Sequence, residues 1–229
     1  MLLYGLLHYF IEKIMTDQRN YSLFDHVCLG MDHALRAIFD NPKTTDRPYP
    51  AAKAPEIALS EKERRHSAAL MRINHAGEVA AQALYHGQGL ASQNSVTKQT
   101  MRQAAIEEGD HLAWCRTRLL ELESHTSYLN PVWYLGSFAI GLAAGLIGDQ
   151  WSLGFLAETE SQVVHHLEKH SKLLSAKDQR SQSILQQMQL DEAAHRDTAL
   201  QAGAMVLPWV VQTLMSWTSK VMVKTAYYI

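Results

Sequence analysis

The sequence lacks several features that mark other classes of protein. Its 229 residues contain only two cysteines, Cys28 and Cys115, too few for a disulfide framework and in keeping with a reducing compartment. Basic residues are not in excess, since 21 Lys and Arg face 23 Asp and Glu, for a formal net charge of -2. This balance argues against nucleic acid as a partner. The length fits one domain.

The N-terminus has no long hydrophobic run. The apolar stretch within "MLLYGLLHYFIEKIM" is too short to cross a bilayer, and it has neither the basic start nor the small-residue cleavage site of a signal peptide. We interpret residues 1–14 as an extension that arises from the choice of start site. A short helix at a membrane interface is an equal alternative.

Strand signals are absent too, because neither period-two alternation nor an Asn-Gly hairpin turn occurs. Four of the six prolines lie within residues 40–60, which we interpret as an extended connector. Ser60 and Glu63 have the spacing of a capping box, so a long helix is expected to start there. We therefore expect an N-terminal extension and connector over residues 1–59 and one helical domain over residues 60–229.

Polar breaks and prolines divide that domain into helices of mostly ordinary length. The expected fold class is all-α, a four-helix bundle with additional apolar helices at a membrane interface. The predicted helices cover residues 60–89, 96–124, 132–148, 149–175 and 177–205, and a last one starts at Pro208.

Two short motifs indicate chemistry. "EEGDHLAW" contains Glu108 and His111, and "DEAAHRDTAL" contains Glu192 and His195. In both, the acid and the imidazole lie one turn apart on the apolar face of a helix. An ionised carboxylate in an apolar interior costs several kcal/mol unless a partner neutralises it. No Lys or Arg shares these faces, so a metal ion is the expected partner.

Two further acids complete a pattern of di-metal bundles, in which two helices each add one Glu to two Glu-x-x-His motifs. Glu78 is the one acid in the inward part of its helix. On the fourth long helix we select Glu160 rather than Glu158, because Glu160 shares the apolar face. Four carboxylates would balance two divalent ions, and this ligand set favours iron or manganese over structural zinc.

Second partners for the histidines are also predicted. A ligating histidine usually donates its other N–H to a carboxylate or carbonyl. Asp191 is expected to face His111, and Glu107 to face His195, although each could equally be a solvated surface acid. Other candidates receive structural interpretations first. His166 and His170 have metal-pair spacing without a third ligand, although His166 could lie near Glu160 instead, and we regard His75 and Tyr85 as helix and core residues.

Taken together, "RINHAGEVAAQALYHGQ", "EEGDHLAWC", "AETESQVVHHLEKH" and "DEAAHRDTAL" resemble the demethoxyubiquinone hydroxylases, over roughly residues 60–229. The resemblance implies a ferritin-like fold and two iron ions per subunit. It also implies hydroxylation by O2 of the ring of a polyprenylated methoxy-methyl-benzoquinol in ubiquinone biosynthesis. Some members of this family carry a tyrosine directly after the second histidine of the fourth-helix motif, and this chain has Leu167 at that position. The implied catalytic and metal-binding residues are Glu78, Glu108, His111, Glu160, Glu192 and His195.

An isoprenoid substrate requires access to a bilayer. The apolar segment 132–148 is at the lower limit for a span, and the last helix combines tryptophans with Lys220 and Lys224. We expect a peripheral membrane protein on the cytoplasmic face of a bacterial cell membrane. Packing of both segments on the bundle or on another subunit is the alternative.

Two other functions fit the same residues. A membrane-associated di-iron quinol oxidase would use the same ligands, and so would a ferroxidase or iron-storage protein. The expected partners are the benzoquinol, O2, an electron donor of unknown identity and the membrane surface, with other ubiquinone-biosynthesis proteins as candidates.

Overall fold

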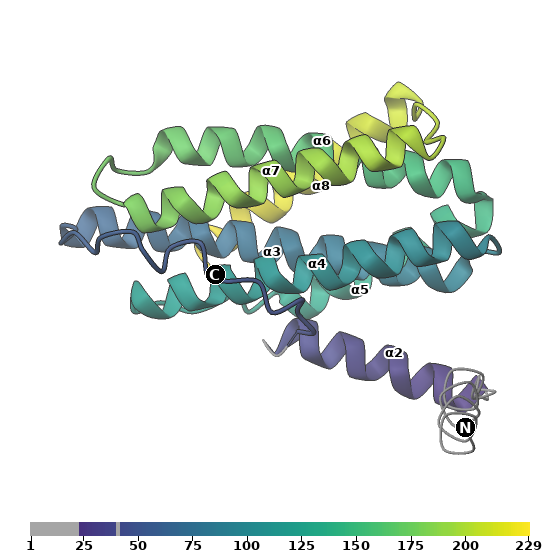
Figure 1. The fold of residues 1–229 in the computed structure, drawn as a ribbon, viewed down its shortest axis with the longest axis horizontal. Coiled ribbons are helices and arrows are strands. Elements are labelled where there is room, and N and C mark those ends of the chain that lie inside the picture. Colours follow the sequence, from purple (N-terminus) through teal and green to yellow (C-terminus); the bar gives the residue numbers. More distant parts are fainter. Residues whose placement is uncertain (1–22, 40–41) are drawn as a thin grey trace, which may run out of the picture. The chain divides into compact units, whose positions relative to one another are not determined.

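The computed structural model describes residues 23–39 and 42–229 (Figure 1). The expectation for residues 1–14 lies outside this part of the chain. Contacts divide the chain into a unit that ends at His33 and a unit from Ala34 to Ile229, with helix α2 crossing the boundary. The first unit contributes the start of α2, which has Asp25 in its first turn.

The regular structure of the described residues is entirely helical, as predicted. One helix, α2, was not expected from the sequence. The others begin and end within a few residues of the predicted bounds. In chain order they are α2 (Leu23–Ile38), α3 (Glu61–Ala91), α4 (Ser95–Glu121), α5 (Asn130–Ile147), α6 (Asp149–Leu173), α7 (Gln179–Gln201) and α8 (Trp209–Ala226).

Four long helices form the bundle. Helix α3 packs along α4, and α6 packs along α7, so the chain builds two helical hairpins that lie against each other (Figure 1). Helix α5 connects the hairpins and covers α3, whereas α8 returns to contact α3 and α6. Buried apolar side chains from all four bundle helices form the core between the hairpins.

Helix ends follow the local sequence. The Glu63 amide donates to the Ser60 hydroxyl at 3.3 Å, and the Ser60 amide donates to the Glu63 carboxylate at 2.8 Å, which confirms the predicted capping box. The Asn94 side chain caps α4 without a reciprocal bond, by accepting from the amides of Val96 at 2.8 Å and Thr97 at 3.3 Å. Between α5 and α6 the chain turns at Gly148, whose φ of 145° is a conformation that glycine alone adopts readily.

Helices α3 and α5 approach each other closely through glycine. A Cβ placed on Gly141 would lie 2.1 Å from the carbonyl oxygen of Leu84, and one on Gly87 would lie 2.4 Å from that of Phe138. One face of α5 is therefore in backbone contact with α3. The opposite face leaves apolar side chains exposed, among them Val132, Leu135, Leu146 and Ile147.

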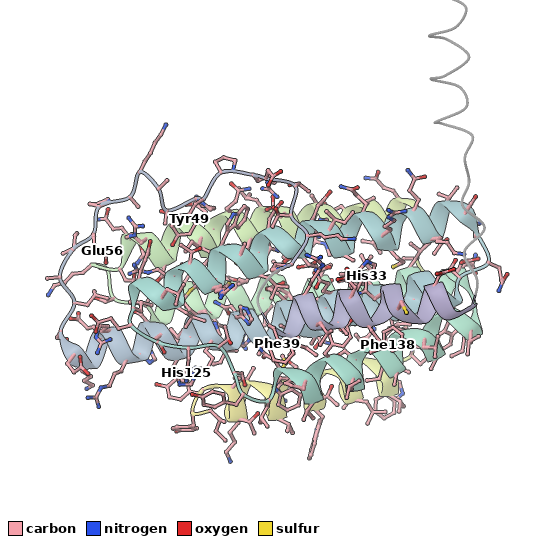
Figure 2. All side chains as sticks on the ribbon, turned by 90° about the horizontal axis from the view of Figure 1, so that it is seen from below. His33, Phe39, Tyr49, Glu56, His125 and Phe138 are labelled. Carbon is pink, nitrogen blue, oxygen red and sulfur yellow. The ribbon has the colours of Figure 1, made fainter. Side chains whose placement is uncertain are left out.

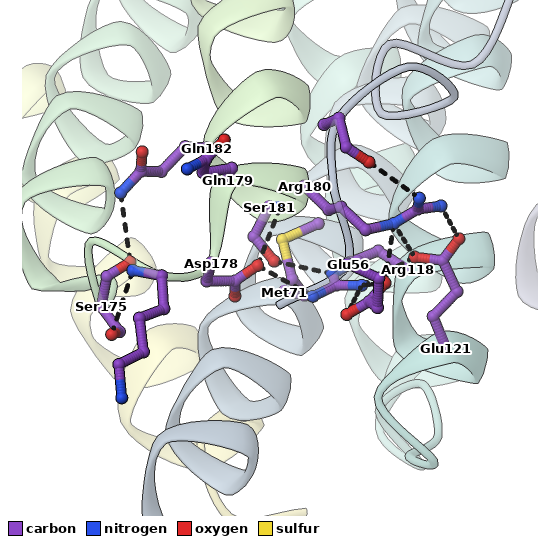
Figure 3. A network of polar contacts seen from close by, with 12 residues as sticks. Glu56, Met71, Arg118, Glu121, Ser175, Asp178, Gln179, Arg180, Ser181 and Gln182 are labelled. Atoms are coloured by element: carbon purple, nitrogen blue, oxygen red, sulfur yellow. Dashed lines mark hydrogen bonds and ion pairs between the residues drawn. The ribbon is translucent and has the colours of Figure 1, made fainter. Parts of the chain in front are cut away.

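A polar network joins the connector to the end of the bundle (Figure 3). The buried Arg118 of α4 pairs with Asp178 at 2.8 Å and with Glu56 of the connector at 3.0 Å. Arg180 of α7 also contacts Glu56, at 2.9 Å. Tyr49, labelled with Glu56 in Figure 2, donates to Glu121 at 3.1 Å. The proline-rich connector is thus tied to both α4 and α7.

Candidate metal centre

All six predicted ligands meet inside the bundle, and they form two overlapping groups. The first group holds ligand atoms of Glu78, Glu108, His111 and Glu192 within 4.8 Å of one another, and the second those of Glu108, Glu160, Glu192 and His195. Glu108 and Glu192 belong to both groups. Each hairpin supplies one Glu and one Glu-x-x-His motif, so the arrangement repeats around the bundle axis.

The histidines direct the same nitrogen inward. His111 Nδ1 lies 3.2 Å from Glu108 Oε2 and 3.0 Å from Glu192 Oε1. His195 Nδ1 lies 3.1 Å from Glu192 Oε2 and 3.9 Å from Glu160 Oε1. The two ring centroids are 6.4 Å apart. These two nitrogens and the shared carboxylates could therefore hold a metal ion.

The outward nitrogens meet the acids that the sequence predicted. His111 Nε2 lies 3.0 Å from Asp191 Oδ2, and His195 Nε2 lies 2.5 Å from Glu107 Oε2. A carboxylate at this position accepts the Nε2 proton, so a bound metal ion would take the place of a proton on Nδ1. Each acid sits on the hairpin opposite its histidine and crosses between α4 and α7.

Burial and charge strongly perturb the carboxyl groups. Burial, followed by repulsion from Glu192, raises the pKa of Glu108 well above its usual range, and the same two causes raise the pKa of Glu160. Burial also acts to raise the pKa of Glu192, but the adjacent His111 and His195 outweigh it and hold that pKa low. The site therefore gathers more negative charge than its own side chains can stabilise.

The unpaired atoms fit a metal centre. Glu78 Oε2, Glu108 Oε1 and Glu160 Oε2 are buried and have no hydrogen-bond partner in the described part of the chain. Buried carboxylate oxygens without partners are costly, whereas oxygen and imidazole nitrogen together are suitable ligands for iron or manganese. The donor set and its orphaned oxygens thus match the di-iron cofactor that the resemblance implies.

A cavity of about 330 Å³ opens beside the centre. It lies between α3, α5, α6 and α8, and Glu78 forms part of its wall. Most of its other wall residues are apolar. Leu167, the residue after His166, is one of them and is buried. The principal lining side chains are Ile73, Leu84, Trp133, Ile140, Phe155, Val163, Leu167, Met215 and Met222.

The remaining candidates have other partners. His170 Nδ1 lies 2.7 Å from the Asn74 amide oxygen and packs on the ring of His166 at 3.9 Å. No third ligand accompanies this pair among residues 23–39 and 42–229, since the two groups above are the ones with metal-like spacing. His75 is a buried helix histidine 3.5 Å from Asn130.

Two contacts were missed from the sequence. Tyr85, interpreted as a core aromatic, donates a short hydrogen bond to Glu160 from a fully buried position. Arg47 of the connector pairs with Asp191 at 2.8 Å. Tyr85 is seven residues after Glu78, two helical turns, so its proximity could be read from helix geometry. Nothing in the local sequence of Arg47 reveals its partner.

Comparison with known proteins assigns the family. The family described as "Ubiquinone biosynthesis protein COQ7" matches residues 65–226. A 3-demethoxyubiquinol 3-hydroxylase of Nitrosococcus oceani is 54% identical over 211 residues, which is 92% of this chain and 99% of that protein. Proteins of the same name from Polynucleobacter necessarius and Acinetobacter baumannii are 53% and 50% identical, and the matches cover 91% and 92% of this chain and 100% of each relative. The chain belongs to the COQ7 family of ubiquinone biosynthesis proteins.

Proposed function

We propose that this protein is a 3-demethoxyubiquinol 3-hydroxylase, a di-iron monooxygenase that uses O2 to hydroxylate the ring of a polyprenylated methoxy-methyl-benzoquinol. The observation that carries the proposal is the buried double group of ligand atoms that shares Glu108 and Glu192. Family membership supports the same reaction. The ligands we assign to two iron ions are Glu78, Glu108, His111, Glu160, Glu192 and His195.

The reaction adds one oxygen atom of O2 to a ring carbon and releases the other as water, so it needs two electrons and two protons from an external reductant. Bound iron would supply the activation of O2. The protein's part is positional. Asp191 and Glu107 hold the imidazoles in one tautomer, and Tyr85 orients Glu160 by a hydrogen bond. The apolar cavity walls exclude water from the reacting ring.

The cavity supports the choice of substrate. Glu78 lies at its wall, so a quinol ring bound there would reach the first of the two ligand groups. The walls that α5 and α8 form are mostly apolar and suit an isoprenoid tail. A hydrophilic iron-storage shell would not need such a cavity or such exposed apolar helices, which makes the ferroxidase alternative weaker.

We also infer that α5 and α8 rest on a membrane. Among the described residues, only Asn130–Ile147 is long and apolar enough to cross a bilayer, by length and composition alone. Its inner face packs on α3 through glycines, which favours an interfacial position over a free span. Helix α8 exposes Trp209 and Trp217, at 75% and 66% of their surface, and Lys220 and Lys224 follow on the same helix.

Metal analysis of matched variants tests the iron assignment. Glu108→Gln removes a ligand that both groups share, so iron should fall from about two per chain to well below one. Glu78→Gln removes a ligand of one group and should leave about one iron. Glu158→Gln, two positions from Glu160 on α6, is the control and should keep both. Two irons in Glu108→Gln would contradict the assignment.

Labelled oxygen separates the hydroxylase from a quinol oxidase. With 18O2, the iron-loaded protein and a demethoxyubiquinol should yield a ring hydroxyl that carries one labelled atom. An oxidase would place all of the label in water and return an oxidised but unhydroxylated quinone. That second result, from protein with full iron content, would retain the metal centre and reject the hydroxylation.

A further inference from the structure

The two histidines of the metal centre have matching outer partners. His111 Nε2 meets Asp191 at 3.0 Å, and His195 Nε2 meets Glu107 at 2.5 Å. In each pair the acid comes one residue before the Glu of the opposite Glu-x-x-His motif. The two halves of the site therefore carry the same carboxylate–imidazole unit, related by the internal repeat of the bundle.

The residues that contact Asp191 and Glu107 are alike in one respect and different in another. Gln187 donates to Asp191 at 3.0 Å, and Gln103 donates to Glu107 at 2.5 Å, each from one helical turn before the acid. Asp191 additionally receives the guanidinium of Arg47, with Nη2 2.8 Å from Oδ2 and 3.0 Å from Oδ1. Within the described residues, Glu107 has no Lys or Arg within ion-pair distance. Arg47 therefore pairs directly with the acid behind His111, whereas it acts on Glu107 only from beyond ion-pair distance.

The connector holds Arg47 in this position. The guanidinium lies 4.9 Å above the ring of Trp114, which in turn is 5.3 Å from the ring of His111. Two residues earlier, the amide of Thr45 donates to Asp110 at 2.9 Å. These contacts already restrict the Arg47 side chain, so it loses little further conformational entropy when it pairs with Asp191. The ion pair therefore costs less entropy than one between two free surface side chains.

Glycine brings the connector onto α4. A Cβ on Gly109 would lie 1.8 Å from the carbonyl oxygen of Lys43, so the connector backbone rests directly on the helix that carries Glu108 and His111. Between the Thr45 and Arg47 contacts, Asp46 adopts a φ of 59°, which turns the chain. The connector is therefore shaped to deliver one cation to one side of the centre.

We propose that Arg47 makes the two metal positions unequal: by pairing with Asp191 it reduces the electron donation of His111, so that an ion held by His111 is reduced more easily than one held by His195. A carboxylate behind a ligating imidazole raises its basicity, and a cation on that carboxylate weakens the effect. Arg47 is a positioning residue, since it contacts neither ligand nor metal. The proposal rests on the di-iron function above.

The two metal positions also differ in their distance from the proposed substrate cavity. Glu78, in the group of His111, lines the cavity, whereas Glu160, in the group of His195, does not. The iron that Arg47 favours for reduction is the one beside the cavity. Electrons would then be held preferentially next to the quinol ring.

The test uses the full chain loaded with 57Fe. Mössbauer spectra of the diferric protein should show two distinct doublets in the wild type, and these should converge in Arg47→Gln. In a potentiometric titration of the same variant, the equilibrium constant for reducing the more easily reduced iron should fall on the order of tenfold, or about 59 mV for one electron. Lys53→Gln removes an equal charge from an exposed position in the connector and should match the wild type.

Arg47→Lys distinguishes charge from shape. It keeps the cation and loses the planar fork, so it should restore most of the separation of the doublets and of the potential. If Arg47→Gln loses iron, the Lys variant decides: wild-type spectra and potential support the proposal, and a shifted potential overturns it. Two irons with unchanged doublets and potential in Arg47→Gln overturn the proposal and leave the di-iron function intact. A wild type that never takes up iron contradicts that function itself.

Discussion

At the scale of single residues, His166 and His170, which are not predicted metal ligands, show how burial keeps an imidazole uncharged. Their rings pack at 3.9 Å between α3 and α6, and His170 Nδ1 donates a hydrogen bond to the amide oxygen of Asn74 at 2.7 Å. Burial, aided by nearby Lys169, lowers the pKa of His166 to about 4. Burial and then His166 lower the pKa of His170 to about 3. Both imidazoles are therefore neutral in the folded protein at pH 7.

This neutrality predicts a loss of stability in mild acid. Above the unfolded-state pKa of about 6.5 neither state binds a proton, so these groups add no pH dependence. Below it the unfolded chain gains protons that the folded chain refuses, and the free energy of unfolding falls by about 1.4 kcal/mol per pH unit for each histidine down to their folded pKa values. In urea unfolding at pH 7, 6 and 5, His170→Gln should show a shallower decline than the wild type.

The matched control for this prediction is His125→Gln, which replaces an exposed histidine and should keep the wild-type slope. Other acids and histidines also titrate in this range, but they are common to all three proteins and cancel in the difference. Equal slopes for His170→Gln and the wild type would mean that His170 takes up a proton while folded.

Residues one turn apart on a helix are the part of the centre that the sequence could predict. Glu108 with His111, and Glu192 with His195, are brought together by helix geometry alone. Glu160 was separable from Glu158 because the two point to different sides of α6, and Glu158 contacts Gln162 instead. The Arg47–Asp191 pair was not predictable, since its members are far apart in sequence and meet only through tertiary packing.

At the scale of helices, the contact between α3 and α5 depends on missing side chains. Gly141→Ala would place a methyl group 2.1 Å from the carbonyl oxygen of Leu84. Because the Leu84 backbone is part of a helix and cannot move alone, α3 and α5 would have to move apart. We expect a loss of about 1–3 kcal/mol in the free energy of unfolding. Gly136→Ala, on the same helix with nothing within 4 Å of the added Cβ, should be neutral or stabilise by about 0.5–1 kcal/mol. Thermal and urea unfolding of the two variants give the comparison, and equal stability would show that the helices are not held in backbone contact.

Helix bounds were largely predictable, because caps, prolines and polar breaks are local signals. The Ser60–Glu63 box marked the start of α3, and Pro208 marked the start of α8. The path of the connector over the bundle could not be predicted. Its prolines indicated an extended chain, but its contacts with α4 depend on Gly109 and Asp110, which lie far along the sequence. Only an assembled bundle shows which helix face is free to receive it.

At the scale of the whole folded unit, α5 and α8 lie at one edge, the lower edge in the view of Figure 2. Both helices line the cavity and carry exposed apolar side chains. Patches of this kind mark surfaces that contact a partner or a membrane. The two helices line the cavity from the inside and expose Leu135, Leu146, Trp209 and Trp217 on the outside. Docking on a bilayer would let an isoprenoid quinol move from lipid to the metal centre without crossing water.

Binding to vesicles tests the docking surface. A Trp209→Ser/Trp217→Ser protein should bind anionic liposomes about tenfold more weakly than the wild type in co-sedimentation, because two aromatic anchors are lost. Leu190→Ser replaces an equally exposed apolar residue on α7 and should bind as the wild type does. Equal binding by the double variant, or none by the wild type, would contradict the docking of this edge on a membrane.

The backbone contact between Lys43 and Gly109 means that the connector cannot be removed without changing the surroundings of the metal centre. A fragment cut at Ser60 would retain every side chain proposed to hold iron, and its helices would keep their capping signals. It would nonetheless lack the guanidinium that distinguishes the two halves of the centre. Transplanting the helices alone into another scaffold would therefore leave Asp191 without its cation, and that part of the electronic bias would have to be rebuilt from outside them.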